Sequence, residues 1–213
     1  MQPSSLQVCL LAGSAGHPSH TRTCLDLLAQ QLRLLETDTH IWDLAQTPLP
    51  LFDPHFYPDP HKNASALVRK LAALTEQADA FIWGSPVYHN SFSGVLKNAL
   101  DSLSLQQFHH KPVAFVSCGN NDRTASQPCD QLRCIARGLH AVAIPTQIVA
   151  LPTDFVRTQQ GYILIDEGLK ARLALLAQEL CSYALALRHV RAALVEAALH
   201  GSPNGVRHEE ANV

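Results

Sequence analysis

The chain has 213 residues, with 18 acidic and 16 basic side chains, a formal net charge of -2 and only 16% charged residues. This composition gives no electrostatic reason to expect nucleic acid or an anionic membrane surface as a partner. The longest apolar segments are well short of the roughly 20 residues that span a bilayer, and no secretion signal is legible, so we expect a cytoplasmic protein.

Short apolar runs alternate with amphipathic segments along the chain, and five prolines between residues 45 and 61 predict a long surface loop there. In chain order we expect strand 6–11, helix 21–35, strand 40–44, helix 63–78, strand 79–83, helix 94–103, strand 112–118, helix 126–139, strand 143–149 and helix 166–187, the last continuing in part to about 199.

This alternation predicts an α/β protein whose parallel sheet has helices on both faces, a three-layer α/β/α sandwich. We expect a single domain over residues 1–200 and a disordered polar tail over 201–213. The segment 192–199 is apolar enough to pack either on its own domain or on a partner subunit, and both options stay open.

The turn after the first strand is rich in hydroxyl groups. Ser14, Ser19 and Thr21 lie before and at the predicted start of a helix, where unpaired N–H groups attract phosphate. The turn lacks both the G-x-G-x-x-G spacing of a dinucleotide site and the G-K-[ST] of a P-loop. Several hydroxyl donors suit one phosphate monoester, while a simple helix cap by Ser19 or Thr21 is the alternative.

A second polar loop, residues 85–91, follows the third strand. Pro86 and Tyr88 offer a flat wall, and the N–H groups of residues 88–90 offer donors to a ring with polar edges. In a sheet of order 2-1-3-4-5, both loops open onto one crevice at the point where the order reverses. Gly119, after the fourth strand, would let the backbone approach a ligand there. Taken singly, these residues are equally typical of solvent-exposed turns.

Other kinds of chemistry lack their sequence patterns. The twelve histidines show neither H-E-x-x-H nor a zinc-type spacing, so we expect no metal site. The six cysteines form no C-x-x-C pair, and we expect buried free thiols rather than disulfides. A G-x-S-x-G nucleophile elbow is also missing, so no sequence motif supports an α/β-hydrolase. We therefore predict no catalytic acid, base or nucleophile.

Residues 85–101 read SPVYHNSFSGVLKNALD, which resembles the T-P-E-Y-N-G-S-x-P-G-x-L-K-N-A-[IL]-D motif of the NADPH-dependent FMN reductase family. The family's first motif, G-S-x-R-x-x-S-x-[NTS], is similar to residues 13–21. The resemblance covers about residues 6–150 and is most specific in the second motif. It implies a flavodoxin-like fold with a five-stranded parallel sheet in the order 2-1-3-4-5.

The resemblance implies that FMN binds between the two loops. The residues expected to hold its phosphate are Ser14, Ser19 and Thr21. The residues expected around its ring are Pro86, Val87, Tyr88, His89 and Asn90, with Gly119 nearby. Two departures from the family pattern would weaken FMN binding: Gly16 stands where an arginine is common, and Asn120 replaces the second glycine of the third loop.

The family implies a flavin oxidoreductase that passes hydride from NADPH or NADH to FMN and then to a small-molecule acceptor. Free flavin, a quinone, an azo compound and a metal oxyanion are the acceptors we expect. Relatives of this kind are usually homodimers or homotetramers. Two alternatives stay open: a non-catalytic flavin-binding redox sensor or electron carrier, and a hydrolase or transferase that uses the crevice without flavin.

Overall fold

The computed structural model describes residues 5–199. Its five-stranded sheet has the order β2-β1-β3-β4-β5, and every neighbouring pair is parallel, so the predicted flavodoxin-like order is confirmed. The strands are β1 Gln7–Ala12, β2 Asp38–Asp43, β3 Ala80–Pro86, β4 Pro112–Cys118 and β5 Val142–Ala150.

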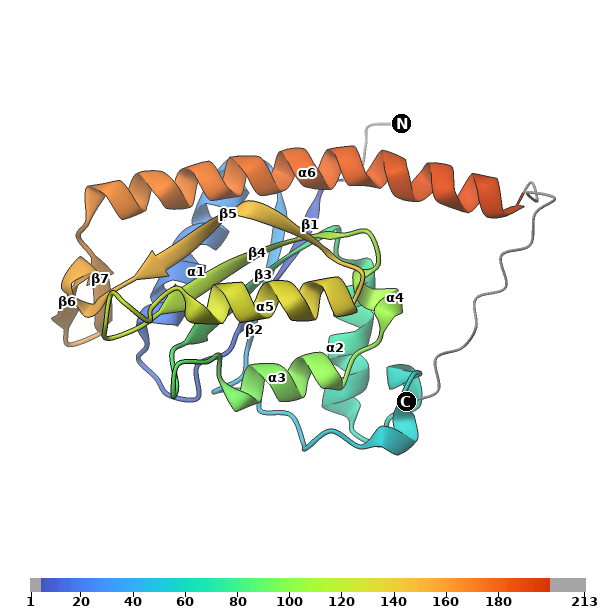
Figure 1. Ribbon diagram of the computed structural model, residues 1–213, viewed down its shortest axis with the longest axis horizontal. Coiled ribbons are helices and arrows are strands. Elements are labelled where there is room, and N and C mark those ends of the chain that lie inside the picture. Colours follow the sequence, from blue (N-terminus) through green and yellow to red (C-terminus); the bar gives the residue numbers. More distant parts are fainter. Residues whose placement is uncertain (1–4, 200–213) are drawn as a thin grey trace.

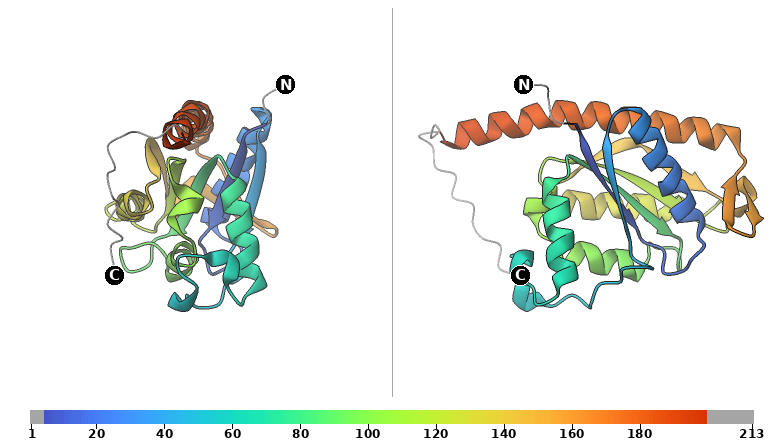
Figure 2. Two further views of the ribbon diagram at one scale, coloured as in Figure 1. Left: turned by 90° about the vertical axis from the view of Figure 1, so that its right-hand side faces the viewer. Right: turned by 180° about the vertical axis from the view of Figure 1, so that it is seen from behind.

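Helices cover both faces of the sheet, and the three layers are visible end-on in Figure 2. One face is covered by α1 (His20–Leu34) and α6 (Glu167–Leu199). The other face is covered by α2 (Ala66–Gln77), α3 (Gly94–Asp101), the short α4 (Leu105–Phe108) and α5 (Gln127–Gly138).

The alternation of side chains along each strand divides the core in two. In β1, Leu10 and Ala12 pack with α1 and α6, while Cys9 and Leu11 pack in the cluster on the opposite face. All five strands are crossed by helices on at least one side, and the central ones are buried on both. Continuous apolar runs are the pattern that such strands require, which is why the sequence predicted them.

Six short elements were not predicted. The short helix α4 follows α3, and the proline-rich loop contains two 3-10 turns, η1 (Pro54–Phe56) and η2 (Pro60–Lys62). After β5, the turn η3 (Pro152–Asp154) leads into an antiparallel hairpin of β6 (Phe155–Thr158) and β7 (Gly161–Leu164). This hairpin lies at one end of the molecule, beside the start of α6 (Figure 1).

The last helix is one element of 33 residues that runs the length of the molecule and past the sheet (Figure 1). The side chains of residues 192–197 are exposed, so this segment does not pack on its own domain, and packing on a partner subunit stays a prediction. The predicted tail at 201–213 lies outside the described residues. Within 5–199, no helix is long and apolar enough to cross a bilayer.

Candidate functional site

The carboxyl ends of β1, β3 and β4 open onto one crevice of about 240 Å³. Most of the residues predicted from the two motifs line it. They are Ser14, Ser19, Thr21, Pro86, Val87, Tyr88 and Gly119. The convergence expected from the strand order is therefore present in the structure.

The loop before α1 has the donors that a phosphate monoester needs. Ser19 caps the helix, accepting the Arg22 N–H at 3.0 Å, and its own O–H is left to donate. The backbone N–H groups of His20 and Thr21 make no hydrogen bond within the described residues. The Thr21 side chain lines the crevice, and its Oγ1 is buried with no partner among those residues. The helix cap and a phosphate site are thus compatible here, and the residues present fit the phosphate of FMN.

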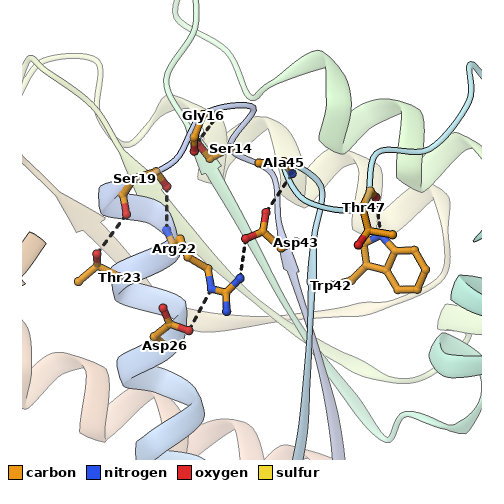
Figure 3. Close-up of polar contacts among 10 residues, drawn as sticks. All are labelled: Ser14, Gly16, Ser19, Arg22, Thr23, Asp26, Trp42, Asp43, Ala45 and Thr47. Atoms are coloured by element: carbon orange, nitrogen blue, oxygen red, sulfur yellow. Dashed lines mark hydrogen bonds and ion pairs between the residues drawn. The ribbon is translucent and has the colours of Figure 1, made fainter. Parts of the chain in front are cut away.

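Arg22 does not replace the arginine that is missing at Gly16. Its guanidinium lies between two carboxylates, 3.0 Å from Asp26 Oδ1 and 2.5 Å from Asp43 Oδ2 (Figure 3). Burial alone would lower the pKa of Arg22, but the hydrogen bonds and charges of the two carboxylates outweigh it and raise that pKa. The side chain therefore joins α1 to the end of β2 and is not available to the loop.

The loop after β3 is a tight two-residue hairpin turn. Tyr88 and Ser91 exchange N–H···O bonds of 2.9 and 3.0 Å, and the two residues between them, His89 and Asn90, have φ values of 49° and 63°. Positive φ at both central positions is the geometry of a type I′ turn, and Asn and His tolerate it better than most residues.

This turn corrects part of the prediction. The side chains of His89 and Asn90 are exposed at its tip and do not line the crevice. The Tyr88 N–H, expected to be a free donor, is bonded to Ser91, and the Val87 N–H donates to the Cys118 carbonyl at 2.9 Å. The N–H groups of His89 and Asn90 make no hydrogen bond within the described chain and remain as donors.

Several residues of the second motif hold the site together without lining the crevice. The Ser93 N–H donates to Ser85 Oγ at 2.8 Å, and the Ser93 hydroxyl donates to the Gly13 carbonyl at 2.5 Å. The Gly13 N–H donates to Gly84 O at 2.8 Å, so close that a Cβ on Gly13 would lie 2.6 Å from this oxygen. These contacts set the spacing of the two loops.

Glycine is also required at Gly119. A Cβ there would lie 2.8 Å from Val87 Cγ2 and 3.0 Å from Ala125 Cα. The end of β4 can pack this closely against Val87 and Ala125 only because this position has no side chain.

Sequence reasoning did not predict six residues of the crevice lining, which are Gly16, Pro18, His20, Cys118, Asn120 and Tyr162. Tyr162 belongs to the hairpin β6–β7, and the His20 ring at the start of α1 lies 4.0 Å from the Tyr162 ring, centroid to centroid. A signal was present, because residues 155–158 and 161–164 are two strand-like segments separated by two polar residues, a pattern typical of a hairpin.

Comparison with known proteins agrees with this geometry. The pattern of the NADPH-dependent FMN reductase family matches residues 6–155. An FMN-dependent NADPH-azoreductase of Staphylococcus saprophyticus is 35% identical over 176 residues, 82% of this chain and 93% of the relative.

Two solved structures share the fold. One is FerB, a flavoenzyme NAD(P)H:(acceptor) oxidoreductase of Paracoccus denitrificans, with a TM-score of 0.67, 19% identity and coverage of 84% of this chain and 97% of the other. The second is a flavodoxin of Streptococcus pneumoniae, with a TM-score of 0.55, 16% identity and coverage of 84% and 99%.

The predicted fold and the predicted FMN- and NADPH-dependent oxidoreductase are thereby confirmed. The match over residues 6–155 and the identity to a full-length relative together show that the chain belongs to the NADPH-dependent FMN reductase family.

Proposed function

We propose that this protein reduces azo compounds with electrons from NADPH, through FMN held at the carboxyl ends of β1, β3 and β4. The observation that carries the proposal is the convergence of both motif loops on one crevice. The choice of acceptor is supported by the relative with 35% identity, which is an azoreductase. Quinones, free flavin and metal oxyanions are the competing acceptors.

In this proposal the phosphate of FMN is held by the hydroxyl groups of Ser14, Ser19 and Thr21 and by the free N–H groups at the start of α1. The ring lies against Pro86, Val87, Tyr88 and Gly119, which line the same crevice. His89 and Asn90 contribute to FMN binding through their backbone N–H groups, which donate no hydrogen bond within the described chain.

FMN supplies the hydride chemistry, so the protein needs to position it and to shape its electrostatics. The N–H groups of His89 and Asn90 would stabilise negative charge at the polar edge of the ring. Tyr88 is 45% exposed, which leaves one side of the crevice open to NADPH and then to the acceptor. No side chain has to act as an acid or base.

The test is an assay of purified protein with FMN, NADPH and a monoazo dye under nitrogen. We expect loss of the dye absorbance coupled to NADPH oxidation, and neither change without FMN. NADPH oxidation that reduces a quinone but leaves the dye intact would show that the azo assignment is wrong. Protein that binds FMN but never oxidises NADPH would favour the sensor or carrier alternative.

We also propose a single-domain protein that acts in the cytoplasm as a homodimer or homotetramer, without nucleic acid. The support for assembly is the exposed apolar surface at the end of α6, where Leu194 is 46% and Val195 is 59% exposed. Sedimentation analysis of the wild type and of a Leu194→Glu, Val195→Glu variant tests this. A wild type that sediments as a monomer contradicts the proposal.

A further inference from the structure

The hairpin β6–β7 holds a histidine at the phosphate end of the crevice. His20 is the first residue of α1, and its ring lines the crevice beside Ser19 and Thr21. The ring lies 4.5 Å from the Phe155 ring and 4.0 Å from the Tyr162 ring, centroid to centroid. These two contacts pack the imidazole against the hairpin at the start of α1.

Both ring nitrogens of His20 are available to a ligand. Neither makes a hydrogen bond to any residue within 5–199, although the ring is half-buried. The adjacent Thr21 hydroxyl is buried, lines the same crevice and also lacks a partner in that part of the chain. A helix N-terminus, an unpartnered hydroxyl and an imidazole without a hydrogen bond in the described chain therefore line one crevice, and together they are a donor set that suits a phosphate group.

The phosphate loop has no arginine side chain free to face a phosphate group. The arginine of the family is replaced by Gly16, and Arg22 is held between Asp26 and Asp43 (Figure 3). Arg157 lies opposite Tyr162 in the hairpin, with its guanidinium carbon 5.8 Å from the Tyr162 ring centroid, so it sits behind that ring and does not line the crevice. Among the crevice-lining residues of the described chain, His20 is the ionisable side chain at the start of α1, directly after the phosphate loop.

The pKa of the His20 imidazole lies below its ordinary value before any anion binds. Burial lowers the pKa of its imidazole, and the carboxylate of Asp154 in η3 opposes this only in part. The other charged or titratable groups around it are Tyr162 and Arg157 of the hairpin and Arg22 of α1, which is already paired. A phosphate monoester carries about -1.5 to -2 charges at pH 7, and an adjacent anion favours the charged imidazolium.

We propose that His20 is the cationic ligand of the FMN phosphate in this protein, in place of the missing arginine, and that it takes up one proton from solvent when FMN binds. The proton comes from water or buffer, and no covalent bond of FMN or of the protein changes. This inference rests on the proposed function, since it requires FMN in the crevice. The role of the hairpin in this proposal is to hold the His20 imidazole, the cationic group that the phosphate loop itself does not supply.

The experiment measures the dissociation constants of FMN and riboflavin by quenching of flavin fluorescence. At pH 7.5 the phosphate has lost its second proton, whose pKa is about 6, so the ligand itself releases none. Isothermal titration in two buffers of different ionisation enthalpy gives the number of protons taken up. The variants are His20→Gln, His20→Arg and, as a control, His189→Gln, whose side chain is exposed on α6.

We expect His20→Gln to lower the affinity for FMN about tenfold or more, the size of a lost charge-assisted hydrogen bond, and to abolish proton uptake. Its affinity for riboflavin, which has no phosphate, should be unchanged, which also shows that the variant is folded. His20→Arg should retain tight FMN binding without proton uptake, because its charge is permanent. His189→Gln should behave as the wild type.

Equal FMN affinity in the wild type and His20→Gln would overturn the inference, as would proton uptake that persists in His20→Gln. Either result leaves the proposed function intact, because NADPH oxidation and riboflavin binding do not depend on His20 in this scheme. A wild type that binds neither flavin would overturn the proposed function, and this inference with it.

Discussion

At Thr21 the chain keeps a group that stability alone would not select. The side chain is 1% exposed, and its Oγ1 has no hydrogen-bond partner in the described residues. A buried polar atom without a partner costs about 1–3 kcal/mol, whereas a valine has the same shape and no such atom. The hydroxyl group is explained if it meets a ligand that the folded chain binds.

We therefore predict that Thr21→Val has opposite effects on stability and on binding. The free energy of unfolding of the FMN-free protein should rise by about 1 kcal/mol, because an unpartnered hydroxyl is removed. The affinity for FMN should fall about tenfold, because a hydrogen bond to a charged group is lost. Urea unfolding without ligand and a fluorescence titration with FMN measure the two effects.

Thr75→Val is the matched control for this prediction. Thr75 is also fully buried, but its hydroxyl donates to the Leu71 and Ala72 carbonyls at 2.9 and 3.0 Å. Its loss should leave FMN affinity unchanged and should not stabilise the protein. If Thr21→Val bound FMN as tightly as the wild type, the assignment of Thr21 to the phosphate would be wrong.

Residue types near the first strand were enough to predict the hydroxyl groups of the phosphate loop, because Ser14, Ser19 and Thr21 are close together in sequence. His20 could not be singled out in the same way. Its position depends on Phe155 and Tyr162, which lie far along the chain and meet α1 only in the folded protein.

Among the secondary-structure elements, α5 holds the turn that follows β3. The Ser91 hydroxyl donates to Gln131 Oε1 at 2.6 Å, and Gln131 Nε2 donates to the Asn90 carbonyl at 3.0 Å. One side chain of α5 thus binds two consecutive residues of the turn, Asn90 and Ser91. The motif itself contains no trace of this contact, because Gln131 lies 40 residues beyond Ser91.

We predict that Gln131→Leu weakens the binding of FMN and riboflavin by the same factor, about three- to tenfold, the range of one net hydrogen bond. The factors should be equal because the proposed function assigns this turn to the ring, which both ligands share. Fluorescence titrations with both flavins measure this. Gln178→Leu, at an exposed position of α6, is the control and should change neither affinity. A loss confined to FMN would contradict the assigned role.

At the amino end of the sheet, the Lys111 side chain caps the carboxyl end of α2. Its buried Nζ donates to the Thr75 and Glu76 carbonyls at 3.0 and 2.7 Å, where a helix C-terminus favours a cation. Burial, assisted by the charge of Arg191, nevertheless lowers the Lys111 pKa to about 8, although nearby carboxylates oppose the shift. In the unfolded chain the pKa of a lysine is about 10.4. Between pH 8 and about 10.4 the unfolded state therefore binds more protons at Lys111 than the folded state does.

This sign predicts that the Lys111 contribution to stability rises with pH across that window. The wild type should gain about 2 kcal/mol relative to Lys111→Met between pH 7.5 and 9.5, even if the variant is less stable at both. The midpoints of urea unfolding at the two pH values give the difference. Parallel changes in the two proteins would show that the Lys111 pKa is not lowered by folding.

The elements that sequence analysis predicted well are those with a long, regular pattern of apolar residues, such as the continuous apolar run of β4 and the helical repeat of leucines in α1. The hairpin β6–β7 was missed because each strand has only four residues and one face, with Val156 and Ile163, is exposed. Its alternation is real but short, and short runs of this kind do not distinguish a strand from a loop. The helix α4 has four residues and no period that could be read at all.

On the scale of the whole molecule, the two ends of the sheet have different roles. The carboxyl end carries the crevice, while the amino end is closed by contacts between β3, β4 and α6. Strand order could be predicted because alternating strands and helices restrict the topology strongly. The continuation of the last helix to about 199 was also predicted, but whether residues 192–197 pack on their own domain was not, because an apolar segment has the same pattern whether it is buried or exposed.

Asp79 is the residue that joins α6 to the amino end of the sheet. It is 13% exposed and lies just before β3. Arg188 donates to it at 2.6 and 3.1 Å, Arg191 at 3.1 Å, and the Gln7 N–H at 3.1 Å. A half-buried carboxylate with this many charged partners contributes far more than a surface ion pair.

We predict that Asp79→Asn lowers the free energy of unfolding by about 2 kcal/mol, because the charge that faces both arginines is removed while they stay partly buried. Asp101→Asn is the control: Asp101 pairs with Lys97 on the surface of α3, 2.6 Å away, and its loss should change stability by less than about 0.5 kcal/mol. Urea unfolding measures both variants. FMN affinity should stay at the wild-type value in Asp79→Asn, since the crevice lies at the other end of the sheet. A variant that loses stability and flavin binding together would instead show that α6 supports the crevice as well as the sheet.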